Sequence, residues 1–148
     1  MKVNKNYAAY LAALWSFLFG VVHFIWAADF YWGLPKEPAK QAFEKDWFYI
    51  YNLVAGMLFL FAAGLAMLLG SNTTKWKRSV IVCGWCCTMV LIFRGTAAVI
   101  LWLYFIITPH SGYSSISIWD IWFLTGGLLF LLSVLRFQRL CSTRNYKL

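Results

Sequence analysis

Charged residues are scarce in this sequence, and acidic residues are the scarcest of them. Only 12% of the 148 residues are charged, with five Asp and Glu against 13 Lys and Arg, whereas 62% are hydrophobic. Because soluble domains carry roughly a quarter charged residues, this composition excludes an ordinary soluble globular protein. The lack of charge predicts an all-α integral membrane protein whose main partner is the lipid bilayer.

Polar interruptions are missing from four stretches, each of which is long enough to cross a bilayer. A helix needs about 20 residues to span roughly 30 Å of hydrocarbon. The sequence predicts transmembrane helices at 7–28, 47–69, 80–107 and 118–137, which form one four-helix bundle without a soluble domain. The first stretch exceeds the apolar core of a secretory signal, about 7 to 15 residues, so we interpret it as a membrane helix.

Acidic residues are absent from three segments outside these helices: the N-terminus, the middle loop and the C-terminal tail. All five carboxylates lie in or beside the other two loops, at Asp29, Glu37, Glu44, Asp46 and Asp120. The positive-inside rule then places both termini and the middle loop in the cytoplasm. Since the net charge of +8 is a topology signal of this kind, we expect no nucleic-acid partner.

Charged, amide and imidazole side chains are rare at membrane depth, with one in each predicted helix: His23, Asn52, Arg94 and Asp120. Counted from the cytoplasmic basic residues at about 1.5 Å per residue, Arg94 and Asp120 both lie about 24 Å into the membrane. The same count, taken from Lys5 and from Gly70, places His23 and Asn52 at about 27 Å. We therefore expect all four near one level, at the extracytoplasmic edge of the hydrocarbon.

An ionisable side chain in a membrane span normally turns toward a partner, because its insertion costs about 2.5 to 3.5 kcal/mol. We predict an Arg94–Asp120 ion pair between the third and fourth helices, with His23 and Asn52 close enough to share hydrogen bonds. Two interpretations stay open. In the first, the cluster is purely structural and fixes which helices pack together. In the second, it is a pocket for a small polar or lipid-headgroup ligand, whose entrance is lined by Trp26, Asp29, Asp46 and Trp119.

Small residues form a stripe on the second predicted helix at helical spacing: Asn52, Ala55, Gly56, Phe59, Ala63 and Ala66. Close approach along small residues is the main packing device between helices in lipid. We expect this stripe to face the interior of the bundle.

Metal and cofactor motifs are lacking, since only one histidine lies in a predicted helix and no HExxH or closed Cys and His set occurs. We expect neither a metal nor a cofactor. The CGWCC stretch contains the CxxC pair Cys83 and Cys86, a pattern typical of thiol-disulfide exchange. Its predicted place near the cytoplasm, where thiols stay reduced, favours packing, and a redox role is the alternative.

Three function classes remain open. The first is a binding or accessory protein of the membrane that holds a polar or lipid-headgroup ligand in the polar cluster. The second is an interaction protein, such as a subunit of a membrane complex or an immunity-type protein, in which the cluster only orders the helices. The third is a membrane enzyme that uses His23 as acid or base, for which the sequence offers no neighbouring nucleophile.

Short motifs in three of the helices resemble one known family. They are HxxWxxxxxWGLP, which starts at His23, an arginine in the third helix, and SIWDIWFLTGGLLFLL around Trp119 and Asp120. This combination is similar to small four-span bacterial membrane proteins catalogued as domain of unknown function 3995. The resemblance implies a four-span fold in a bacterial plasma membrane, and it implies no activity.

Overall fold

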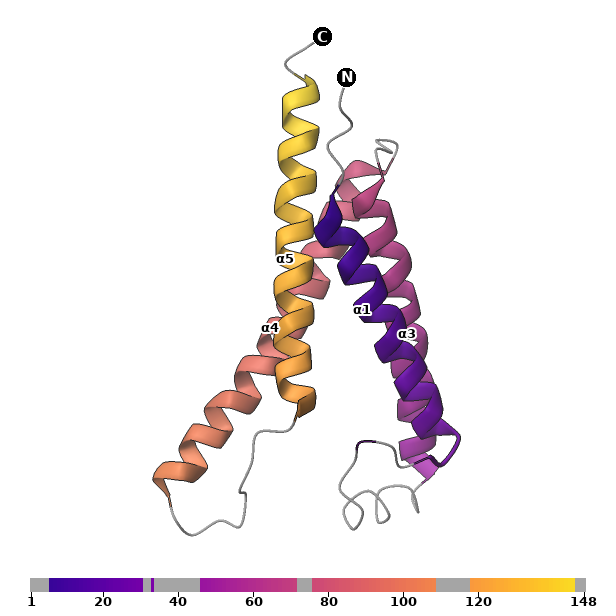
Figure 1. The fold of residues 1–148 in the computed structure, drawn as a ribbon, viewed down its shortest axis with the longest axis vertical. Helices are drawn as coiled ribbons and strands as arrows, with labels where there is room; N and C mark the ends of the chain where they lie inside the picture. Colours follow the sequence, from indigo (N-terminus) through magenta and orange to yellow (C-terminus); the bar gives the residue numbers. More distant parts are fainter. Residues whose placement is uncertain (1–5, 31–32, 34–45, 72–75, 109–117, 146–148) are drawn as a thin grey trace. The chain divides into compact units, whose positions relative to one another are not determined.

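Four long helices make up the computed structural model, which describes residues 6–30, 33, 46–71, 76–108 and 118–145 (Figure 1). They are α1 (Tyr7–Ala27), α3 (Asp46–Gly70), α4 (Lys77–Ile107) and α5 (Ile118–Asn145). Each contains a stretch long and apolar enough to cross a membrane. The protein is therefore an all-α, multi-pass membrane protein, as its composition predicts.

The predicted helix bounds agree with the structure except at the basic ends of α4 and α5. Helix α4 begins at Lys77 instead of residue 80, and α5 continues to Asn145 instead of ending at 137. The prediction ended the last helix where the apolar run ends. Arginine, glutamine and leucine in the following turns are good helix formers, so the helix continues beyond the apolar span.

The first of two compact units joins Met1–Ala12 to Leu65–Leu148, and α4 packs on α5 within it. Three glycines allow this close packing. A Cβ atom added at Gly84 would lie 2.5 Å from Val134 Cγ2, one at Gly95 would lie 2.6 Å from Leu124 Cγ, and one at Gly127 would lie 2.6 Å from Ile92 Cγ1. The two helices cross and then separate toward the C-terminal end of α4 (Figure 1).

Segments of all four helices meet in this unit around Asn6, which directly precedes α1 and is 1% exposed. Its Nδ2 atom donates to the Leu69 carbonyl at 3.1 Å and to the Ser133 carbonyl at 3.0 Å. Leu69 also packs on Gly84 of α4, 3.4 Å from the position of an added Cβ atom. Asn6 thus links the start of α1, the end of α3 and the middle of α5.

The second unit, Ala13–Gly64, pairs the remaining parts of α1 and α3. At Gly20 an added Cβ atom would lie 3.2 Å from the Gly56 carbonyl oxygen, and at Gly56 one would lie 2.9 Å from the Phe24 ring. Asn52 and Gly56 of the predicted small-residue stripe are buried in this unit. For these two residues the prediction of an inward-facing stripe is confirmed.

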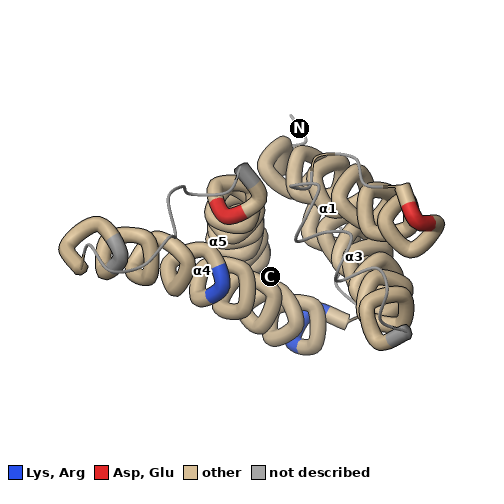
Figure 2. The backbone as a smooth tube through the Cα atoms, turned by 90° about the horizontal axis from the view of Figure 1, so that it is seen from below, with Lys and Arg blue, Asp and Glu red and all other residues tan. Residues whose placement is uncertain are grey.

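Charges lie near the ends of the helices and on α4 (Figure 2). The Lys77 ammonium donates to the Cys141 carbonyl at 3.3 Å, so the start of α4 lies beside the end of α5 and the two helices are antiparallel. This contact brings the basic residues that begin α4 to the basic end of α5. Their cytoplasmic location stays a prediction.

Candidate functional site

His23 of α1 and Asn52 of α3 form a buried hydrogen-bonded pair in the second unit. Their side chains are 3% and 0% exposed, and His23 Nδ1 lies 2.8 Å from Asn52 Oδ1. The Asn52 amide nitrogen donates to the Phe48 carbonyl at 2.9 Å, which leaves the amide oxygen facing the imidazole. An amide oxygen only accepts, so Nδ1 carries the proton and donates it to Asn52.

This tautomer determines what the other ring nitrogen can do. In the neutral imidazole, Nε2 becomes a hydrogen-bond acceptor. The atom is buried and has no hydrogen-bond partner among the described residues. A buried acceptor left without a partner costs about 1 to 3 kcal/mol, so Nε2 is a place where an entering N–H or O–H group would be stabilised.

Aromatic rings surround the imidazole. The ring of Phe19 lies 4.9 Å away edge-on, that of Trp26 lies 5.0 Å away edge-on, and Phe59 stacks on it at 5.5 Å with an interplanar angle of 12°. The two phenylalanine rings offer no polar hydrogen to Nε2. They hold the orientation of the imidazole by packing alone.

Arg94 of α4 and Asp120 of α5 form the ion pair predicted from the sequence, within the first unit. Arg94 Nη1 lies 3.2 Å from Asp120 Oδ1, and the guanidinium carbon lies 5.1 Å from the centre of the Phe123 ring. The carboxylate is in the first turn of α5, where the helix dipole favours negative charge. The two partners differ in exposure: the Arg94 side chain is 55% exposed, against 15% for Asp120.

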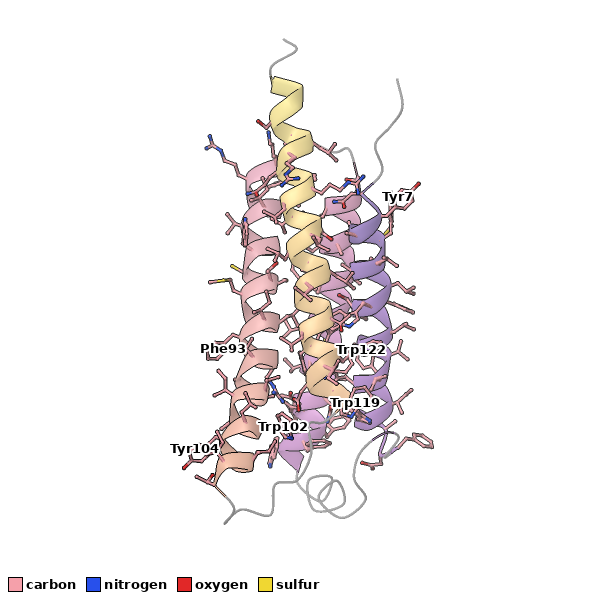
Figure 3. The ribbon with its side chains drawn as sticks, turned by 60° about the vertical axis from the view of Figure 1, so that its left-hand side comes forward. Tyr7, Phe93, Trp102, Tyr104, Trp119 and Trp122 are labelled. Carbon is pink, nitrogen blue, oxygen red and sulfur yellow. The ribbon has the colours of Figure 1, made fainter. Side chains whose placement is uncertain are left out.

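The predicted pocket entrance is made of residues with different environments. Trp26 is 6% exposed and packs against the His23 ring. Trp119 is half-buried and lies on α5, as Trp122 does (Figure 3). The side chain of Asp46 lies outside the described residues. As entrance residues, all of these stay predictions.

Asp29 is exposed and ends α1 with a left-handed backbone, at φ 63°. Its amide donates to the Trp26 carbonyl at 3.1 Å, and the next amide, of Phe30, donates to the Ile25 carbonyl at 3.2 Å. These two bonds form a Schellman motif, in which Asp29 takes the position that glycine usually occupies. This local role of Asp29 was not predicted from the sequence.

The two polar pairs belong to different units, one to α1 and α3 and the other to α4 and α5. Each pair forms as a contact between two helices. Hydrogen bonding among all four side chains stays a prediction.

The cysteines of the CGWCC stretch lie on α4 as free thiols. Cys83 is half-buried and Cys86 is exposed, and a redox role for this pair stays a prediction. Within the described ranges, no group of three or more His, Cys, Asp or Glu side chains is placed to hold a metal ion. Cys141, farther along the chain, is 7% exposed inside α5.

Asn6 and Phe123 are the contact residues that the sequence analysis missed. An Asn directly before an apolar run is a common helix N-cap, which was the available signal for Asn6. Phe123 lies one turn after Asp120, so the helical spacing alone places it near the ion pair.

No family model, no curated protein and no solved structure matches this chain. The resemblance to domain of unknown function 3995 therefore rests on its short motifs, and membership stays a prediction.

Proposed function

We propose that this membrane protein is a binding or accessory protein that holds a small polar or lipid-headgroup ligand at its predicted extracytoplasmic side. In this proposal the membrane is a bacterial plasma membrane and both termini face the cytoplasm. The observation that carries the proposal is the buried His23 Nε2 atom, which accepts no hydrogen bond from the described residues.

The His23–Asn52 pair supports ligand binding because its hydrogen-bonding capacity is used on one side only. Asn52 is satisfied by His23 and by the Phe48 carbonyl, so it holds the imidazole and fixes the tautomer. Nε2 is then a preorganised acceptor among aromatic rings. A ligand with a hydroxyl or amine group matches it, whereas a bare anion does not.

A double substitution, His23→Phe with Asn52→Leu, separates binding from folding. It replaces both partners of the hydrogen bond by apolar groups, which is far less costly than leaving one buried partner unpaired. We expect the double variant to fold and to lose a molecule that native mass spectrometry detects on the wild-type protein in mild detergent. The same bound molecules on both proteins would contradict the proposal.

The second candidate is an interaction protein in which the polar pairs only order the helices. It is supported by the fact that each pair joins two helices of one unit, α1 to α3 and α4 to α5. This function predicts that the single substitution Asn52→Leu destabilises the protein while no small molecule is bound to either form. An enzyme using His23 as acid or base would additionally need a reacting group within about 3 Å of Nε2.

A further inference from the structure

We propose that Arg94 binds the phosphate of a zwitterionic phospholipid, of the phosphatidylethanolamine kind, in the leaflet next to the start of α5. The inference goes beyond the proposed function, because its ligand binds at a second site. It concerns the Arg94–Asp120 pair and makes no use of His23, so the two proposals are tested by different variants.

The Arg94 guanidinium has more N–H donors than its hydrogen bond to Asp120 uses. Arg94 Nη1 reaches one carboxylate oxygen, Asp120 Oδ1, at 3.2 Å, and the side chain is 55% exposed. The structure gives the guanidinium no other hydrogen-bond acceptor among the residues that it describes. A guanidinium is a planar fork whose parallel N–H groups match two oxygens of a phosphate, so its exposed edge suits a phosphodiester.

Phe123 keeps the exposed guanidinium in place. Its ring centre lies 5.1 Å from the guanidinium carbon, a distance at which the cation is attracted to the ring face. With the ion pair on one side and the ring on another, Arg94 has less conformational freedom to lose when a ligand binds.

The depth of the pair fits a lipid phosphate. Asp120 lies 16 residues before Arg136, one of the basic residues near the other end of α5, so about 24 Å of helix separates them. Hydrocarbon is roughly 30 Å thick, so a long arginine side chain at this depth reaches the headgroup boundary.

Apolar side chains beside Arg94 provide a surface for acyl chains. Phe93 is 76% exposed and points away from α5, as Figure 3 shows, and Ile100 is 64% exposed farther along α4. On α5, Ile121 is 56% exposed next to Asp120. Contacts of this kind bind a lipid and leave a free headgroup unaffected, so we assign the phosphate to a phospholipid.

Charge balance selects the headgroup. Arg94 and Asp120 together are neutral, so an anionic lipid would add an uncompensated negative charge at the edge of the hydrocarbon. A zwitterionic headgroup brings its own cation, which the Asp120 carboxylate attracts, and a primary ammonium approaches a carboxylate more closely than a quaternary ammonium does. A choline headgroup has no N–H group, so the ethanolamine type is favoured.

The test uses the full-length protein in nanodiscs that contain equal amounts of phosphatidylethanolamine, phosphatidylcholine and phosphatidylglycerol. After gentle release into detergent, native mass spectrometry counts the lipids that stay bound. We expect phosphatidylethanolamine to exceed each of the other two by about tenfold, the effect of one hydrogen bond to a charged group. Equal retention, or an excess of phosphatidylglycerol, would overturn the inference.

Variants locate the bound lipid. R94Q should lose the preference for phosphatidylethanolamine, whereas R78Q, the matched change at the basic end of α4, should keep it. If R94Q fails to fold, F123L provides a milder loosening of the guanidinium and should reduce the preference. If R94Q folds and still prefers phosphatidylethanolamine, or if F123L does so in its place, the lipid binds elsewhere and the inference is refuted.

Two further measurements distinguish this lipid site from a site for a small soluble molecule and from the proposed function at His23. Soluble glycerophosphoethanolamine added to the wild-type protein should not displace the bound lipid, and displacement at equal concentration would show a small-molecule site instead. The His23→Phe and Asn52→Leu double variant should keep its phosphatidylethanolamine. If it keeps the lipid but its other bound molecules match those of the wild type, the proposed function fails while this inference stands.

Discussion

Gly127→Ala tests the packing that brings Arg94 and Asp120 together. A Cβ atom at Gly127 would lie 2.6 Å from Ile92 Cγ1, 3.0 Å from the Ile92 backbone nitrogen and 3.4 Å from its Cα atom. The side-chain contact alone would be relieved by a rotamer change. The backbone contacts require α4 and α5 to move apart.

The expected cost is that of overpacking a close helix contact, about 1 to 3 kcal/mol. Gly64 is the matched control because nothing lies within 4 Å of a Cβ atom added there. Gly64→Ala should therefore be neutral or stabilising by up to about 1 kcal/mol, the helix propensity difference between the residues.

Reversible unfolding in mixed micelles, followed by circular dichroism, measures both variants against the wild type. The account predicts a lower free energy of unfolding for Gly127→Ala only. Equal stability of the two alanine variants would refute the close α4–α5 contact and with it the geometry argued for the ion pair.

Four other outcomes are expected. Asp29→Gly should raise the free energy of unfolding by about 1 kcal/mol, because glycine adopts the left-handed backbone of that position without strain; no gain would contradict the capping role. Asn6→Leu should cost about 1 to 3 kcal/mol in the same assay, since it removes a buried donor from two carbonyls. Asp120→Asn should cost about 1 to 3 kcal/mol, because it leaves the Arg94 cation without its counter-charge at the edge of the hydrocarbon; an unchanged free energy of unfolding would show that the pair does not stabilise the fold. After replacement of the natural cysteines, an impermeant thiol reagent added outside should label a cysteine at Ser114 but not one at Thr73, and the reverse result would invert the topology.

Hydropathy and the cost of charge in lipid account for what the sequence predicts well. The four helices follow from uninterrupted apolar stretches longer than a bilayer requires. The pairing of Arg94 with Asp120 follows because both are ionisable, lie at one depth and belong to consecutive helices. These are statements about single segments and pairs, for which composition and spacing suffice.

Features that depend on three-dimensional contacts were harder to predict. Asn6 binds carbonyls from two distant helices, and no periodicity in the sequence reports such a junction. The exposure of Arg94 depends on how α5 begins beside α4, which the depth count does not contain. The left-handed backbone at Asp29 follows from a terminal hydrogen-bond pattern, where aspartate replaces the usual glycine.

The most direct test of the proposed function is native mass spectrometry of the wild-type protein beside the His23→Phe and Asn52→Leu double variant, both purified in the same mild detergent. The account predicts a bound molecule on the wild type that is absent from a folded double variant. Identical spectra of bound molecules from two folded proteins would contradict it and leave the buried pair as a contact that only orders α1 and α3.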